Sequence, residues 1–210
     1  MECRDYKHLA RTGAKNRAYS ALPFQASIKL LYFACIMQIR TNIQPGDLGY
    51  VISLHGILYA QEYGLDHTFE GYVASGVGEF GKSFDERKDR LWLAEDYGQI
   101  AGSIAIAGQS DLTAQLRWFL VAPDARGCGL GNSLLKAALD FCRAREFRSV
   151  FLWTLSDLKG AARLYQQAGF HRTEHETHEI WGAVRTEERY DLTLEIAPNP
   201  LTIETGNVVD

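Results

Sequence analysis

A glycine-rich stretch, Arg126–Gly131, is the feature that most constrains what this chain can fold into, because its three glycines alternate with other residues. The residues before it, Leu116–Val121, are aliphatic, aromatic and β-branched, which is typical of a buried strand. After it, apolar side chains recur at helical spacing over about 131–145. Such a turn presents backbone N–H groups at a helix N-terminus, where an anion is favoured, and Arg126 adds a forked cation. The stretch therefore predicts a pyrophosphate site.

Spacing excludes two other phosphate-binding loops. A nucleotide P-loop has four residues between its glycines and then Gly-Lys-Ser/Thr, and no Lys follows Gly131. A dinucleotide-binding fingerprint has an acidic residue closing the next strand, whereas here that strand ends in Trp153 and Thr154. The alternative for the loop taken alone is a turn that binds no ligand.

The stretch Arg126-Gly-Cys-Gly-Leu-Gly131 resembles the Arg-x-x-Gly-x-Gly/Ala signature of the GCN5-related N-acetyltransferases (GNAT family). At the expected distance, Ala161–Phe170 resembles the "AA-x-x-LY-x-x-x-GF" helix of that family. Two linked motifs are more specific than either alone, so the chain is identified as a member over about residues 37–197. Four further segments resemble the acetyltransferase domains often fused to MarR-type regulators: His55-Gly56, Tyr59–Gly64, Leu152–Thr154 and His178–Gly182.

The resemblance implies acetyl-CoA as co-substrate. Its pyrophosphate would bind backbone N–H groups of the glycine-rich loop, and its pantetheine arm would pair with the preceding strand as an added strand. A strand N–H there would also polarise the thioester carbonyl. The expected cofactor-binding residues are Phe119, Leu120, Val121, Arg126, Gly127, Cys128, Gly129, Leu130, Gly131 and Asn132.

The same resemblance gives Tyr165 the role of the acid that protonates the departing CoA thiolate, with plain packing as the alternative. An aliphatic amine has a pKa near ~10.4 and must lose a proton before it attacks. The family often places a glutamate on the strand for this, but Leu116–Leu120 contains no carboxylate. The candidates left open are Glu62, His55, or a water molecule held by His178, although a histidine on an apolar helix face is more often structural.

Two further groups are candidates for contact with substrate or metal. Arg117, if it points inward, can hold a substrate carboxylate; otherwise it is a solvated strand residue. His178 is the other candidate substrate residue. Three histidines invite a metal site, but His175 and His178 are three residues apart in a predicted strand and point to opposite faces, so no metal is expected.

The patterns predict an α/β chain whose sheet mixes parallel and antiparallel strands. The resemblance implies the GNAT fold: a central mixed, mostly antiparallel sheet, flanked by helices, with a splayed strand pair holding the cofactor. Asp47 is expected to cap the first helix, and Tyr97-Gly98 to form a hairpin turn. The expected elements are a strand from Met37, helices 47–62 and 67–82, strands 90–95, 99–106 and 113–121, helix 131–145, strand 149–154, helix 158–168, and an antiparallel pair near 173–182 and 188–196.

Charge divides the chain near Met37. Residues 1–36 carry six Lys or Arg and two Asp or Glu, and the remainder carries 16 and 24. We therefore predict a basic N-terminal extension over 1–36, an acetyltransferase domain over 37–197 and a C-terminal tail over 198–210, with Met37 as an alternative natural start.

Composition indicates a cytoplasmic protein. The chain is 46% hydrophobic and 23% charged, as is ordinary for soluble proteins, and has no apolar run long enough to span a bilayer. Its four cysteines are far apart, which suits a reducing compartment. A net charge of −4 argues against a nucleic-acid surface.

The predicted function is N-acetyltransfer from acetyl-CoA to a primary amine of a small molecule, amino acid or peptide. The alternative is a non-catalytic acyl-CoA sensor or interaction module, which the missing strand carboxylate favours and Tyr165 opposes. Homodimers are common in the family, so the resemblance allows a homodimer.

Overall fold

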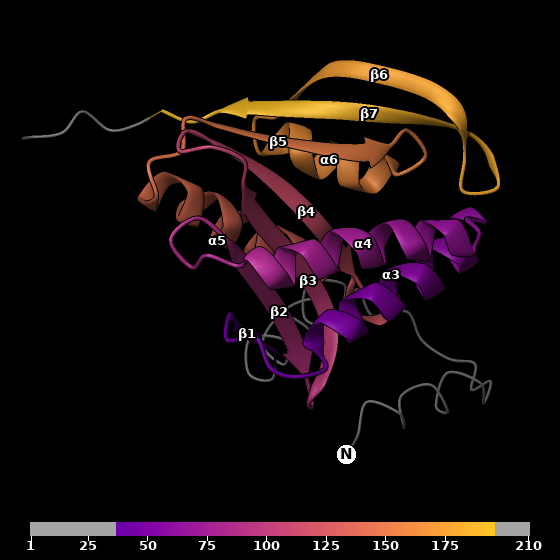
Figure 1. Ribbon diagram of the computed structural model, residues 1–210, viewed down its shortest axis with the longest axis horizontal. Coiled ribbons are helices and arrows are strands. Elements are labelled where there is room, and N and C mark those ends of the chain that lie inside the picture. The colour runs from indigo at the N-terminus through magenta and orange to yellow at the C-terminus, as the bar shows by residue number, and fades with distance from the viewer. Residues whose placement is uncertain (1–36, 196–210) are drawn as a thin grey trace, which may run out of the picture. The chain divides into compact units, whose positions relative to one another are not determined.

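The computed structural model describes residues 37–195, and these fold around a mixed sheet (Figure 1). The strand order is β1-β2-β3-β4-β5-β7-β6; β4 and β5 run parallel, and every other neighbouring pair is antiparallel. The predicted α/β fold with a mixed, mostly antiparallel sheet is confirmed. The elements are β1 (Gln38–Arg40), α3 (Asp47–Tyr63), α4 (His67–Ser83), β2 (Arg90–Asp96), β3 (Gln99–Gly108), β4 (Thr113–Val121), η1 (Pro123–Ala125), α5 (Leu130–Ala144), β5 (Ser149–Leu155), α6 (Lys159–Gln167), β6 (His171–Ile180) and β7 (Ala183–Thr193).

Helices cover both faces of the central strands. Side chains alternate along β2, so Leu91 and Leu93 join the core formed with α3 and α4, whereas the ring of Trp92 packs edge-on against Phe141 of α5 at 5.6 Å. Figure 1 shows α3 and α4 in front of β2, β3 and β4, with α5 behind them. Burial on both faces explains why β2 reads as a continuous apolar run.

The start of α3 differs from the prediction for Asp47. Gly46, with φ 100°, is the N-cap, and no side chain caps the helix. The buried Asp47 carboxylate instead accepts two hydrogen bonds from the Arg40 guanidinium, both at 2.7 Å. That guanidinium is the main cause that lowers the pKa of Asp47. The N-cap prediction was wrong because β1 brings a cation to this carboxylate.

The last hairpin is tighter than predicted. Trp181 and Gly182 both have positive φ, 52° and 86°, and form a two-residue turn between β6 and β7. Residues 183–187, left outside the predicted strands, therefore belong to β7. The hairpin turn predicted at Tyr97 and Gly98 is confirmed, with φ 48° and 77°.

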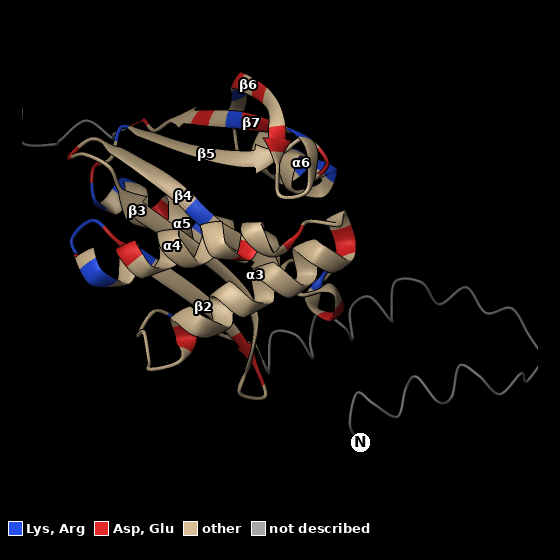
Figure 2. Ribbon diagram, turned by 45° about the vertical axis from the view of Figure 1, so that its right-hand side comes forward, with Lys and Arg blue, Asp and Glu red and all other residues tan. Residues whose placement is uncertain are grey.

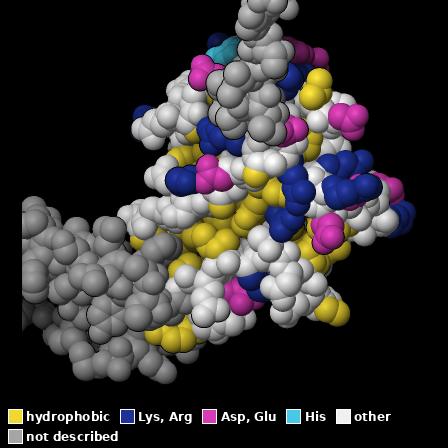
Figure 3. Space-filling model, turned by 90° about the vertical axis from the view of Figure 1, so that its left-hand side faces the viewer, with side chains coloured by type: hydrophobic (Ala, Val, Ile, Leu, Met, Phe, Trp, Pro, Cys, Tyr) yellow, Lys and Arg dark blue, Asp and Glu magenta, His cyan; other side chains and the backbone are white. Residues whose placement is uncertain are grey.

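Acidic and basic residues lie together on the surface. Figure 2 shows both signs along β6 and β7, whereas α3 and α4 carry few charges. β6 lies at one edge of the sheet and is mostly exposed, and charged side chains there oppose edge-to-edge pairing with another chain. Figure 3 shows acidic side chains beside basic ones next to a strip of apolar side chains. On α5, Asp140 forms ion pairs with Lys136 and Arg143.

Candidate functional site

The site begins where β4 and β5 separate. Their parallel pairing is limited to Thr113–Gln115 against Ser149–Phe151. Beyond this, Trp118 has a left-handed backbone, φ 47°, inside a bulge at which the register with β3 shifts. The buried Ser103 hydroxyl donates a 2.7 Å hydrogen bond to the Trp118 carbonyl and holds the bulge. The C-terminal part of β4, Phe119–Val121, therefore has no strand partner on its β5 side among residues 37–195.

The glycine-rich loop follows β4 through η1. Gly127 and Gly129 have φ 78° and 87°, a conformation that favours glycine, and Gly129 is the N-cap of α5. Gly131 lies inside the first turn of α5, where a Cβ would meet Leu164 at 3.5 Å. Alternate glycines thus let the chain turn twice and then enter the helix, with free N–H groups at its start.

A cavity of about 560 Å³ lies between this loop, α3, β4 and α6. Of the ten predicted cofactor-binding residues, it is lined by all but Cys128. The Cys128 thiol donates instead to the Ala125 carbonyl at 2.8 Å, within the loop. The cavity has the N–H groups, the cation and the length of unpaired strand that the diphosphate and amide groups of CoA require.

Arg126 and Glu62, predicted for separate roles, form one ion pair in this cavity. The guanidinium Nη atoms donate to both Glu62 oxygens at 2.9 and 2.8 Å, and Nε donates to the Val121 carbonyl at 2.9 Å. Glu62 therefore lies beside the predicted phosphate site, and both of its carboxylate oxygens are occupied by a bidentate partner. This position does not suit a base acting beside Tyr165.

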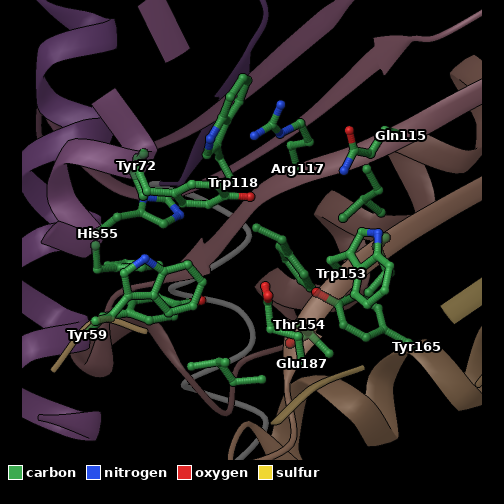
Figure 4. A pocket seen from close by; sticks show the side chains of 17 residues that line it. His55, Tyr59, Tyr72, Gln115, Arg117, Trp118, Trp153, Thr154, Tyr165 and Glu187 are labelled. Atoms are coloured by element: carbon green, nitrogen blue, oxygen red, sulfur yellow. The ribbon is translucent and has the colours of Figure 1, made fainter. Parts of the chain in front are cut away.

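A second, smaller pocket of about 100 Å³ lies on the other side of the opening between β4 and β5. Three of the predicted catalytic and substrate residues, His55, Arg117 and Tyr165, line it together (Figure 4). Tyr59 and Phe119 line both this pocket and the larger cavity, so the two meet at these rings. His178 does not line the pocket, but its Nε2 lies 2.8 Å from Oε2 of Glu187, which does.

His55 is a buried, neutral imidazole. Its Nδ1 lies 2.8 Å from the Val51 carbonyl, which can only accept, so Nδ1 carries the hydrogen. The ring also stacks on Tyr59, with centroids 5.8 Å apart. Burial lowers the pKa of His55 to about 4. Its geometry and pKa are those of a structural histidine and a weak base.

Tyr165 is 4% exposed and lies among the rings of Phe119, Phe170 and Tyr190, at 5.9 to 6.2 Å between centroids. Burial is the main cause that raises the pKa of Tyr165, and the nearby Tyr59 adds to it. The hydroxyl is therefore protonated throughout the physiological pH range. It can donate a hydrogen bond at the point where the pocket meets Phe119.

Glu187 is a pocket residue that the sequence analysis missed. It lies on β7, opposite Leu155 of β5, and supplies the one carboxylate among the described residues that line the smaller pocket. The predicted hairpin placed it in a loop, because β7 was expected to begin at residue 188. Recognition of Trp181-Gly182 as a two-residue turn would have placed Glu187 on the strand.

The comparison with protein families decides the classification. The model described as "Acetyltransferase (GNAT) family" matches residues 58–170, more than half of the chain. The chain belongs to the GNAT acetyltransferase family. The match begins in α3 and ends just after α6, so it includes the separated strands, the glycine-rich loop and Tyr165.

Relatives of this GNAT protein are distant in sequence. The protein named "Probable N-acetyltransferase camello" of Xenopus tropicalis is 27% identical over 180 residues, 81% of this chain and 82% of that protein. The structure of yncA from Salmonella typhimurium with its cofactor acetyl-CoA has a TM-score of 0.61 and 16% identity, over 79% of this chain and 98% of that one. A spermidine N-acetyltransferase from Vibrio cholerae in complex with CoA and spermine has a TM-score of 0.58 and 19% identity, over 76% and 96%. The two structures show the shared fold.

Two features are absent from residues 37–195. No helix in this part of the chain is both long and apolar enough to cross a bilayer. Nor does it contain a group of three or more His, Cys, Asp or Glu side chains placed to hold a metal ion.

Proposed function

We propose that this GNAT protein is an N-acetyltransferase that transfers the acetyl group of acetyl-CoA to a primary amine of a small molecule, an amino acid or a peptide. One observation carries the proposal: the glycine-rich cavity and the smaller pocket meet at Tyr59 and Phe119, where β4 separates from β5. A donor bound on one side and an acceptor on the other would meet there, beside Tyr165. A cytoplasmic location and a likeness to MarR-fused domains belong to the same proposal.

Acetyl-CoA supplies the activated acetyl group. In the proposed arrangement, N–H groups of the loop from Arg126 to Asn132 bind the diphosphate, and the unpaired edge of Phe119–Val121 pairs with the pantetheine amides. A backbone N–H of β4 stabilises the negative charge that develops on the carbonyl oxygen. Tyr165 donates its proton toward the departing sulfur.

The alternative is a sensor that binds acyl-CoA without turnover. The lack of a carboxylate on β4 is compatible with a sensor, but the match to an acetyltransferase family does not favour it. The two functions share the cavity and differ in the smaller pocket. Release of free CoA thiol that depends on an added amine separates them, because a sensor releases none.

Thermal unfolding of the full chain with and without acetyl-CoA tests the cavity first. At a hundredfold its Kd, the ligand adds about 2.7 kcal/mol to the free energy of unfolding, a shift of several degrees in Tm. Arg143→Ala, on the exposed face of α5, serves as the control and is expected to keep the shift. An unchanged Tm with the folded protein would contradict the proposal.

A further inference from the structure

The smaller pocket combines aromatic walls with one positive and one negative group. Among its described lining residues, Arg117 is the one basic side chain besides the neutral His55, and Glu187 is the one acidic side chain. The two approach the pocket from different strands, β4 and β7 (Figure 4). The aromatic side chains are Tyr59, Phe69, Tyr72, Trp118, Phe119, Trp153, Tyr165 and Trp181.

Arg117 is held without a carboxylate partner in residues 37–195. Its guanidinium carbon lies 4.8 Å from the centre of the Trp118 ring, and no hydrogen bond or ion pair within this range uses its five N–H donors. Gly76 of α4 leaves room for it, since a Cβ at that position would lie 2.7 Å from Nη2. By contrast, Arg126 and Arg189 each bind a carboxylate. Arg117 thus presents a forked donor that matches a carboxylate.

Glu187 is fixed from behind by the neighbouring strand. His178 of β6 contacts Oε2 at 2.8 Å, and Oε1 has no partner among the described residues. The Glu187 side chain is 21% exposed, so it is neither freely solvated nor fully buried. A carboxylate held in this way can accept a hydrogen bond, and then a proton, from an ammonium group in the pocket.

These groups fit an acceptor that carries both charges. Resting on the proposed function, we infer that the acceptor is a zwitterionic amine, an amino acid or short peptide with an apolar side chain. Its carboxylate binds Arg117, its ammonium faces Glu187, and its apolar part contacts the aromatic side chains. A polyamine fits less well, because it would place further cations beside Arg117 and find one carboxylate in the pocket.

The proton balance of this arrangement is complete. Glu187 takes one proton from the ammonium and later releases it to water. The amine nitrogen then forms a bond to the acetyl carbon as the carbon–sulfur bond breaks, with its electron pair remaining on sulfur. Tyr165 gives its proton to that sulfur and is reprotonated by the second proton that the nitrogen loses.

Matched acceptors test the inference. Acetyl transfer and calorimetric binding are measured for phenylalanine against phenethylamine, and for glycylphenylalanine against its decarboxylated analogue, glycyl phenethylamide. The two pairs separate amine and carboxylate by different distances. We expect that, in at least one of the two pairs, the acceptor with the carboxylate has a kcat/KM and an affinity about tenfold or more above those of its decarboxylated analogue. Arg117→Met is expected to abolish this preference, so that each carboxylate-bearing acceptor reacts and binds within about twofold of its own analogue.

Two further variants separate binding from folding effects. Arg189→Met removes an arginine that lies over the Phe151 ring, outside the pocket, and is expected to keep the preference. Glu187→Gln is expected to lower kcat with both members of a pair, and to lower it least at high pH, where the free amine is already abundant. Its Tm is recorded to show that the variant is folded.

The outcomes are distinguishable. Equal turnover and equal binding of the paired acceptors, or an equal loss for both in Arg117→Met, would overturn the inference while the proposed function stands. If no amine is acetylated, the proposed function fails, and the calorimetric comparison still decides the inference: a carboxylate preference that depends on Arg117 supports it, and its absence overturns it.

Discussion

Tyr165 is buried and lines the smaller pocket beside Phe119, a residue that both cavities share. Removal from water raises its pKa, so the hydroxyl stays protonated and can act as a donor without a separate group to keep it neutral. The same burial among aromatic rings is what plain packing would produce. A substitution that keeps the ring and removes the hydroxyl separates the two roles.

Tyr165→Phe is therefore expected to lower kcat for acetyl transfer by about 10²-fold, the lower end for a positioned acid. The Kd for acetyl-CoA should be unchanged, because the larger cavity is not lined by Tyr165. Steady-state kinetics and calorimetry measure the two quantities. If affinity falls and turnover per bound cofactor does not, Tyr165 serves packing alone.

The ion pair of Arg126 and Glu62 bears on the affinity for CoA. Arg126→Ala is expected to weaken CoA binding by roughly 1.5–3 kcal/mol, the loss of charge-assisted hydrogen bonds. Glu62→Gln is the matched variant: it keeps the size of the side chain and frees the guanidinium from its ion pair. Its CoA affinity should equal or exceed that of the wild type, measured by the same calorimetry. Weaker CoA binding in Glu62→Gln with unchanged binding in Arg126→Ala would mean that Glu62, and not Arg126, contributes to CoA binding.

At the level of elements, the bulge in β4 organises the site. It redirects one strand away from β5 in the middle of a sheet, and Ser103 of β3 holds it by a single buried hydrogen bond. The separated strands leave an opening that α3 borders on one side and α6 on the other. A regular ladder continued through Trp118 would close this opening.

The buried imidazole of α3 makes stability depend on pH. Because burial lowers the pKa of His55 from 6.5 to about 4, the unfolded chain takes up this proton first as the pH falls. The free energy of unfolding should therefore decrease by roughly 3 kcal/mol between pH 6.5 and 4 through this group. Urea unfolding across this range measures the loss. His55→Gln, which cannot be protonated, is expected to show a correspondingly shallower slope, and equal slopes would contradict the assignment.

For the whole molecule, the functional question is which part of the chain suffices. The family match and the described sheet lie inside the predicted domain 37–197. The predicted segments 1–36 and 198–210 lie outside the described residues, and so do residues 196 and 197 of the predicted domain. A chain of residues 37–197 is expected to fold and to keep the acetyl-CoA shift in Tm. Thermal unfolding beside the full chain measures this. A truncated chain that folds but shows no shift would mean that one of the removed segments contributes to binding.

The sequence by itself determined the local features. Helical spacing predicted a helix from about 131 to 145, and α5 of the structure runs over Leu130–Ala144. The two linked motifs identified the family, which the comparison with family models confirmed. Side-chain periodicity and turn-forming residues carry this information because they act over a few residues. The turn at Trp181-Gly182 was present in the sequence and was missed, with the loss of Glu187 as its consequence.

The tertiary structure alone decided which groups meet. Arg126 pairs with Glu62, 64 positions earlier, and His178 contacts a carboxylate across a hairpin. The packing of α3 on the sheet buries His55 and so lowers its pKa. The packing of α4 places Gly76 against the guanidinium of Arg117. No local pattern encodes these contacts, because each depends on the packing of elements that are distant in the chain. For this protein, short-range order specified the glycine-rich loop, and long-range packing specified the smaller pocket.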